Sequence, residues 1–444
     1  MGGGCVMMIY KGGIPMLKSF TLENVFSFAD KHELNMQATK IKAHDYSLLT
    51  NKNNKNIPPG MDILPVMSIY GANASGKSNL IRSLLFVLQS IVPKHERYIM
   101  VPYLLNEPHN KNAQIKKPSF ELIFLLDKNE YILTVCSMGV EFYQESLSWR
   151  EAAKGKAKLL YQRKWNSDTR RWKLALGTTI VDKGLIEEIR YVHRMEKSNK
   201  NLLLYALCKR KAHNLFTAIS RWVSSFSTSQ YMAVENTMPG ILAIYSIGEM
   251  NPHFKFLNEL KSKERVSEFL RAMNPLIKGF DFIKDENLSG NSKDRYQLIF
   301  KYANLPEEAS EIGEADELLS KFESRGIYSS FILLPAILIA LEKGGLVIVD
   351  ELESSLHPLL MAKVVSMFTN PDINTGGGQM IFTTHNALIM DRKYLRQDEI
   401  SFVEKNNTGR SEIYRLSDID GVRSDLDFCK NYILGAFGAV PSFN

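Results

Sequence analysis

The residues best suited to chemistry form one glycine-rich segment, Gly71-Ala72-Asn73-Ala74-Ser75-Gly76-Lys77-Ser78, which matches the pattern GxxxxGK[ST]. Its glycines let the backbone fold so that several N–H groups face one anion, at the positive end of the following helix. Lys77 would reach the β- and γ-phosphates of ATP, and the Ser78 hydroxyl would bind Mg²⁺. We therefore expect residues 71 to 78, together with Asn79, to bind nucleotide phosphates.

The sequence around this loop is the context that such a site needs. Ile63 to Tyr70 is a mostly apolar run that ends abruptly at glycine. Apolar side chains then recur at helical spacing, at Leu80, Ile81, Leu84, Leu85 and Leu88. The predicted order is strand, loop, helix, which disfavours the plain alternative of a glycine-rich turn with a surface lysine.

A second segment ends in two acids. Leu346 to Val349 is typical of a buried parallel strand, and Asp350 and Glu351 follow it directly. A carboxylate at the end of a buried strand is costly unless something compensates its charge, which nucleotide-bound Mg²⁺ would do. We expect Asp350 to hold the metal and Glu351 to orient and deprotonate the attacking water. Alone, the pattern also fits a capped strand end, so this assignment depends on the glycine loop.

Two weaker signals complete the candidate site. Ile381 to His385 reads as a strand ending in histidine, and His385 could hydrogen-bond the γ-phosphate. Shortly before the apolar run Phe331 to Leu341, the hydroxyl of Ser324 and the N–H of Gly326 could bind a phosphate held by a second copy of the chain. The plain alternatives are a structural histidine and a helix capped by Ser324.

The composition is that of a globular protein with several domain-sized units. The chain has 444 residues, 45% of them apolar, and a net charge of only +7. Its four cysteines are scattered without metal-binding spacing, which favours a reducing cytoplasm over a disulfide framework. The longest apolar run, Phe331 to Leu341, has 11 residues, against about 20 for a membrane-spanning helix, so we expect a buried core helix there.

Changes in periodicity divide the chain into four parts. Residues 1–15 are expected to be a floppy leader, with translation starting at Met1 or Met16. Residues 16–182 would form the N-terminal half of the core, with two paired strands in Met16 to Met36 and a hairpin in Lys158 to Leu176. Residues 183–305 read as a mainly helical insertion, helical character being expected in Lys183 to Phe226 and Asn251 to Ile283. Residues 306–444 would start with an acidic linker and form the C-terminal half.

In this order, the motifs resemble the ABC-type ATPase heads of the RecF, SMC and OLD class. The resemblance implies an α/β fold: a P-loop NTPase of ABC/RecF-like type, whose split head has a mixed sheet, an antiparallel β subdomain and a helical insertion. It also implies that Ser324 and Gly326 belong to the signature motif, that Ser354 to His357 form the D-loop and that His385 is the switch histidine. ATP would lie between the heads of at least a dimer, with Lys77 of one facing Ser324 of the other.

Several stretches look closer still to the AAA-annotated, RecF-like ATPases of bacterial antiphage defence loci, namely GANASGKSNLI, VDELESSLHPLL, IFTTHN, ISFVEKN and YILGAFGAVP. Such proteins often work beside a TOPRIM-type or RloB-like partner, as in the PARIS system. Two positions depart from the pattern. Ile327 stands where threonine often follows the signature glycine, and Ala436 stands where the tail usually has arginine.

A basic stretch leaves a second function open. Nine Lys or Arg residues lie between Arg150 and Lys173, with Trp165 and Trp172 among them. Cations neutralise phosphates and aromatic rings stack on bases, so nucleic-acid contact is possible, although a solvated hairpin with buried tryptophans fits as well. We weigh a regulatory ATPase of antiphage defence, which controls a separate effector, against a DNA-binding structural clamp used in repair or maintenance. The ATPase subunit of a transporter is disfavoured, because no membrane segment is evident.

Overall fold

The structure is a computed structural model. It describes residues 13–41, 44–91, 99–103, 116–151, 154–180, 182–224, 256–257, 259–284, 296–303, 325–354, 356–423 and 426–441. The leader expected at residues 1–15 lies almost wholly outside these residues, as does the acidic part of the linker expected after residue 305.

A five-stranded mixed sheet forms the centre of the head. Its order is β11 (Gly345–Val349), β12 (Gly378–Thr383), β3 (Val66–Tyr70), β13 (Ile400–Lys405) and β14 (Ser411–Arg415). The first four strands are parallel to their neighbours, and β14 runs antiparallel to β13. Every residue of β3, β11 and β12 is buried, as expected for parallel strands covered on both faces. Because β3 comes from the N-terminal half and its neighbours from the C-terminal half, the head is split.

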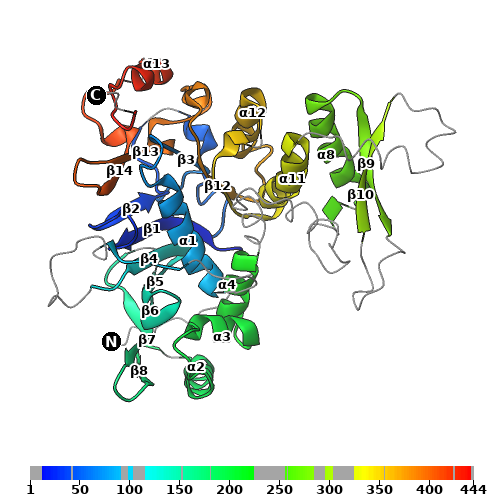
Figure 1. Cartoon of the computed structure of the whole chain (residues 1–444). Helices are drawn as coiled ribbons and strands as arrows, with labels where there is room; N and C mark the ends of the chain where they lie inside the picture. Colours follow the sequence, from blue (N-terminus) through cyan, green and yellow to red (C-terminus); the bar gives the residue numbers. More distant parts are fainter. Residues whose placement is uncertain are drawn as a thin grey trace.

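A second, seven-stranded antiparallel sheet lies beside the first, in the order β2-β1-β4-β5-β6-β7-β8. Its strands are β1 (Met16–Glu23), β2 (His32–Asn35), β4 (Ser119–Leu126), β5 (Asn129–Met138), β6 (Glu141–Glu151), β7 (Lys158–Asn166) and β8 (Arg171–Leu176). The predicted β1–β2 and β7–β8 pairs are confirmed. Helix α1 (Lys77–Ile91) shares one core with this sheet, and in Figure 1 it lies between the two sheets.

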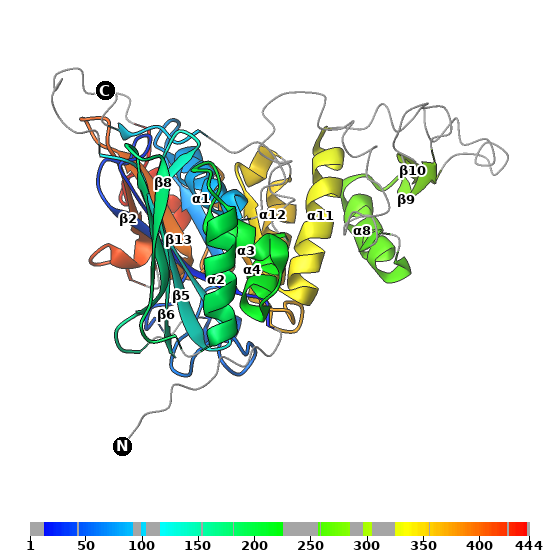
Figure 2. The ribbon, with the colours of Figure 1, turned by 90° about the horizontal axis from the view of Figure 1, so that it is seen from below.

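The insertion divides into two bodies with different neighbours. Helices α2 (Lys183–Met195), α3 (Leu203–Arg210) and α4 (Asn214–Ser224) contribute to the core that the antiparallel sheet and α1 share. Helix α8 (Leu260–Met273) and a two-stranded sheet of β9 (Ile277–Lys284) and β10 (Tyr296–Tyr302) pack instead near α11 (Arg325–Lys343). Figures 1 and 2 show this second body standing to one side of the head, beyond α11.

The helix predicted up to Ile283 is wrong beyond Met273, because residues 277–284 form the strand β9. Phe280 and Phe282 alternate with Asp281, which is the two-residue period of a strand. The two rings lie 4.8 and 6.3 Å from the ring of Phe331 on α11, while Asp281 pairs with Lys263 and Lys301. The period extends over too few residues to stand out against the helical pattern before it.

The other helices of the described residues are α12 (Pro358–Thr369), α13 (Phe428–Ile433) and the short 3-10 turns η1 (Asp45–Ser47), η4 (Leu352–Ser354), η5 (Ala387–Ile389), η6 (Gln397–Glu399) and η7 (Leu416–Asp418). Among them, α12, η6 and η7 contact strands of the mixed sheet. Helix α11 is buried along most of its length, which confirms the predicted core helix. None of the helices in the described part of the chain is long and apolar enough to cross a membrane.

Glu145 joins the first body of the insertion to the antiparallel sheet. Its fully buried carboxylate accepts hydrogen bonds from Arg163 Nε at 2.9 Å and from the Tyr161 hydroxyl at 2.7 Å. It also accepts the backbone N–H groups of Leu203 and Leu204, at 2.7 and 2.8 Å. One charge therefore neutralises a buried guanidinium and caps the start of α3.

We expect Glu145→Ala to lower the free energy of unfolding by about 3–5 kcal/mol, because it leaves the Arg163 charge buried and unpaired. Denaturant unfolding measures the change. Glu151→Ala, at the exposed end of the same strand, is the matched control and should stay within about 0.5 kcal/mol of wild type. If the two substitutions lowered the free energy of unfolding equally, Glu145 would not be what joins α3 to the antiparallel sheet.

Candidate functional site

Strand order brings the predicted site residues to one edge of the mixed sheet. Val349 pairs with Phe382, and Thr383 pairs with Ile69, so β11, β12 and β3 end almost level. Because the three strands are parallel, the segments that follow them meet at their shared carboxyl edge, where ligands bind in open α/β sheets. Loop 71–76, Asp350 and His385 follow these strands.

The loop between β3 and α1 has a backbone that glycine makes possible. Gly76 has φ +120°, and a Cβ there would lie 2.5 Å from the Ser411 hydroxyl oxygen. A Cβ on Gly71 would collide with the carbonyl oxygen of Val403. Ala74 adopts the left-handed conformation with φ 59°. The turn is therefore as tight as a phosphate-binding loop requires, with Asn73 and Ala74 exposed at its tip and Ala72 half-buried beside them.

Lys77 is folded onto this loop. Its ammonium donates to the carbonyl oxygens of Gly71 at 2.8 Å and Ala72 at 3.0 Å, and the residue is only 6% exposed. Burial lowers the pKa of Lys77, and the nearby carboxylates of Asp350, Glu353 and Glu351 oppose that shift. The ammonium therefore lies within electrostatic reach of the acids that follow β11, although almost three hundred residues separate them in sequence.

Two serines that the sequence did not single out support the loop from outside. Ser411 donates its N–H to the Ser27 carbonyl at 2.7 Å and its hydroxyl to the Ser75 carbonyl. Asn79 donates its side-chain amide to the Ser27 hydroxyl at 3.1 Å. Ser27 follows a turn in which Asn24 and Phe26 have positive φ, a conformation that no sequence pattern here indicates. The hydroxyl of Ser75 is buried without a partner in the described structure, so the loop retains one unused polar group.

The C-terminal segment packs against the strand that leads into the loop. The ring of Tyr432 lies 5.7 Å from that of Tyr70 and 5.6 Å from that of Phe402. Tyr414 donates its hydroxyl to the Phe437 carbonyl at 2.8 Å, which holds the end of the chain on β14. Ala436 is exposed, so its departure from the family pattern leaves this packing intact. The tail thus supports the base of the phosphate loop.

Thr383, which the sequence also did not single out, organises the two acids. Its hydroxyl donates to Asp350 Oδ1 at 2.5 Å and accepts the Glu351 N–H at 2.8 Å. Glu351 itself has φ 55°, a left-handed backbone conformation that is uncommon for residues other than glycine. Asp350 is half-buried and Glu351 is exposed. The acid expected to hold metal is therefore fixed, while the acid expected to act on water faces solvent.

His385 lies two residues beyond β12, close to the same charges. Desolvation lowers its pKa most, followed by the positive charge of Lys77, while Glu353, Glu351 and Asp350 raise it. The lowered pKa favours the neutral imidazole, in which one nitrogen can donate a hydrogen bond to an anion. The five groups that act on one another here are Lys77, Asp350, Glu351, Glu353 and His385.

Of the two expected signature residues, the structure describes Gly326. Gly326 is in the first turn of α11, where its carbonyl accepts the Ser330 hydroxyl at 2.7 Å, and Ile327 is buried in the core. The main contacts of α11 are with α8, β11, β12 and α12, and not with α1. Ser324 lies outside the described residues.

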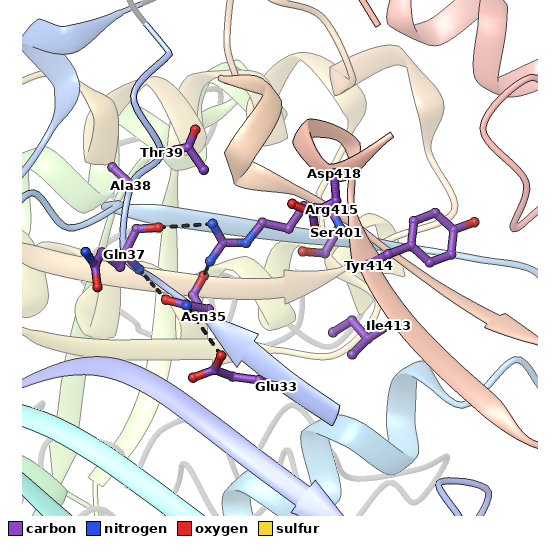
Figure 3. Close-up of a pocket in the computed structure, with 10 residues that line it drawn as sticks. All are labelled: Glu33, Asn35, Gln37, Ala38, Thr39, Ser401, Ile413, Tyr414, Arg415 and Asp418. Atoms are coloured by element: carbon purple, nitrogen blue, oxygen red, sulfur yellow. Dashed lines mark hydrogen bonds between the residues drawn. The ribbon is translucent and has the colours of Figure 1, made fainter. Parts of the chain in front are cut away.

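Figure 3 shows a cavity of about 440 Å³ that none of the predicted site residues lines. At its centre, the Arg415 guanidinium donates to the carbonyl oxygens of Gln37, at 3.0 Å, and Asn35. Burial lowers the pKa of Arg415, and the charges of Asp398, Asp418 and Glu33 oppose this. Since its hydrogen bonds go to backbone carbonyls, Arg415 ties β14 to the last residue of β2 and to the segment that follows.

The basic stretch divides into buried and exposed cations. Arg163 is fully buried, and its guanidinium lies 4.1 Å from the centre of the Trp172 ring, whose N–H donates to the Ser198 carbonyl at 3.0 Å. Trp172 is buried in the core that the sheet shares with α2, so for this residue the alternative of a buried tryptophan holds and stacking on bases does not. Six cations remain exposed, namely Lys154, Lys156, Lys164, Arg170, Arg171 and Lys173.

The side chains present fit Mg²⁺ bound together with nucleotide. The described residues hold no cluster of three or more metal-ligating side chains, and Mg²⁺ at nucleotide sites needs only one or two protein ligands because phosphates and water supply the rest. Asp350 and Ser78 would be those ligands. A tight glycine loop on a helix N-terminus, a buried lysine and an acid at the end of another strand of the same sheet define a P-loop NTPase with an ABC-type split head.

Comparisons with known proteins agree with this class at a coarse level. A family model described as "AAA domain, putative AbiEii toxin, Type IV TA system" matches residues 243–391, which hold Asp350, Glu351 and His385 but not the phosphate loop. That span is about a third of the chain. No curated protein matches the sequence.

Solved SMC heads resemble the structure weakly. The SmcHead bound to the C-winged helix domain of ScpA is 13% identical with a TM-score of 0.43, over 90% of this chain and 97% of that one. The SMC head domain from Thermotoga maritima is 14% identical with a TM-score of 0.35, over 90% and 98%. The Smc head domain with coiled coil and joint from Pyrococcus yayanosii is 11% identical with a TM-score of 0.41, over 95% and 100%. The fold assignment therefore rests on the strand order and the loop.

We expect Thr383→Val to slow nucleotide hydrolysis about tenfold, because Asp350 loses a charge-assisted hydrogen bond and the Glu351 N–H loses its acceptor. Steady-state phosphate release measures the effect. Thr383→Ser keeps the hydroxyl and should restore most of the rate. If the Thr383→Val and Thr383→Ser variants hydrolysed nucleotide at the same rate, the hydroxyl would have no part in placing Asp350 and Glu351.

Proposed function

We propose that this chain is an Mg²⁺-dependent ATPase that acts in the cytoplasm as the regulatory subunit of an antiphage defence system. Its heads would dimerise around ATP, and the dimer would control a separate effector protein. The observation that carries the ATPase part is the convergence of Lys77, Asp350, Glu351 and His385 on the carboxyl edge of one sheet. The defence role rests on the sequence resemblance described above.

The residues would divide the work as follows. The N–H groups of loop 71–76 and the Lys77 ammonium would bind the phosphates. Ser78 and Asp350 would hold Mg²⁺, which would supply positive charge to the phosphate oxygens. Glu351 orients water and accepts its proton. His385 donates a hydrogen bond to the γ-phosphate. Binding is thereby separated from hydrolysis, which depends on Glu351.

The resemblance also favours a nucleotide switch on assembly. It implies that Lys77 of one head faces Ser324 of the other, with Gly326 in the same signature motif, so a second head would complete the site. ATP held between two heads would then join them, and hydrolysis would release them. A TOPRIM-type or RloB-like nuclease supplied in trans is the effector class that the resemblance favours.

The Glu351→Gln variant tests this proposal. Purified alone and with the product of the neighbouring gene, it is weighed by native mass spectrometry with and without Mg-ATP. We expect turnover at least about a hundredfold below wild type, unimpaired ATP binding and a mass of two or more heads that depends on ATP. Lys77→Ala should lose both binding and assembly. Unchanged turnover in Glu351→Gln would remove Glu351 from its role, and an ATP-independent mass would contradict the switch.

One observation favours a DNA-binding clamp as a second candidate. Lys164 and Lys173 are exposed and lie directly opposite each other in the β7–β8 hairpin. Like charges in this position repel, and a phosphate bound over them would relieve the repulsion.

A clamp predicts ATP-dependent duplex binding that weakens steeply with salt and is lost in the Lys164→Glu/Lys173→Glu variant. Fluorescence anisotropy with a labelled duplex measures it. Lys52→Glu/Lys55→Glu carries the same charge change on exposed positions elsewhere and should bind as wild type. A duplex that fails to bind, with or without ATP, would dismiss the clamp.

A further inference from the structure

A third acid at the nucleotide site, Glu353, has no role in the functions assigned above. It lies in η4, which begins directly after Glu351. The left-handed backbone of Glu351 turns the chain there, and the side chain of Glu353 reaches the end of the neighbouring strand β12. The two acids therefore flank one turn, with Glu351 exposed and Glu353 half-buried.

The contacts of Glu353 are directed at the switch histidine. Its Oε1 accepts the backbone N–H of His385 at 2.6 Å. The residue before His385 is already fixed, since Thr384 donates its N–H to the Ile69 carbonyl at 3.0 Å. Glu353 therefore fixes the next peptide unit, from which the His385 side chain projects. No side-chain contact of His385 is needed for this effect.

The second oxygen of Glu353 is buried and has no hydrogen-bond partner in the described structure. A buried carboxylate oxygen without a donor is costly, so its position requires an explanation. The charge acts on both neighbouring basic groups, since it raises the pKa of Lys77 and, among the three acids, has the largest effect in raising that of His385. An acid kept here at such a cost is suited to work on these two residues.

We infer that Glu353 is a positioning residue of the γ-phosphate site. It joins the turn after β11 to the His385 backbone, so that the acid that orients water and the histidine that contacts the γ-phosphate keep one relative position. This inference rests on the proposed ATPase function. A purely structural role, in which Glu353 only satisfies a backbone N–H group, is the competing explanation.

The test compares Glu353→Ala with Glu353→Gln, alone and combined with His385→Ala. ADP affinity by calorimetry reports on the phosphate loop, to which Glu353 makes no side-chain hydrogen bond in the described residues. The ratio of ATP to ADP affinity reports on contacts to the γ-phosphate and needs no hydrolysis. Single-turnover hydrolysis and the melting temperature complete the measurements.

We expect Glu353→Ala to leave ADP affinity within about twofold, to lower the preference for ATP over ADP and to slow hydrolysis about tenfold, the loss of one charge-assisted hydrogen bond. The Glu353→Gln variant keeps an acceptor for the His385 N–H and should restore most of the preference for ATP and most of the hydrolysis rate. In the His385→Ala background, Glu353→Ala should lower the hydrolysis rate and the ATP preference by less than about a further twofold, because the side chain that it positions is already absent.

Additive losses in the double variant would overturn the inference, as would an unaffected Glu353→Ala protein. A lower melting temperature with parallel loss of ADP and ATP affinity would assign the residue a structural role. Failure of the wild type to bind Mg-ATP would instead refute the proposed function. If it binds ATP without hydrolysing it, the affinity ratio still decides the role of Glu353.

Discussion

The site depends above all on the parallel pairing of β12 with both β11 and β3. These ladders join a strand from the first seventy residues to strands from the last hundred, and they bring the three carboxyl ends to the same level. A slip of one residue in a fully buried strand would displace Asp350 or His385 and turn apolar side chains the wrong way. The packing of the core therefore also sets the geometry of the site.

A concentration of charge follows from that pairing. One ammonium, three carboxylates and one imidazole act on each other at the edge of an apolar sheet. Desolvation lowers the pKa of both Lys77 and His385, and the charge of Lys77 lowers that of His385 further. Such groups hold one another in place by opposite charge, and hydrogen bonds add to this: the Thr383 hydroxyl fixes Asp350, and Glu353 accepts the His385 backbone N–H. A triphosphate with Mg²⁺ is a ligand whose own charges suit this arrangement.

The insertion relates to the site through two different bodies. Helices α2 to α4 are bound to the antiparallel sheet by the buried Glu145 network, far from α11 in sequence. The body of α8, β9 and β10 instead packs its phenylalanines on Phe331 in α11, the helix that begins next to Gly326. A movement of this second body would thus be felt at the element expected to face the partner head.

The sequence by itself determined the phosphate loop, its flanking strand and helix, the strand ending in Asp350 and Glu351, and the β7–β8 hairpin. Each is a local pattern, because glycine spacing and hydrophobic period depend on residues close together in the chain. Only the tertiary structure decided that Ser27, Ser411, Thr383 and Glu353 support the site, since their partners are distant in sequence. It also decided that Trp172 faces inward, because a two-residue period shows that faces alternate but not which of them a neighbouring helix will cover.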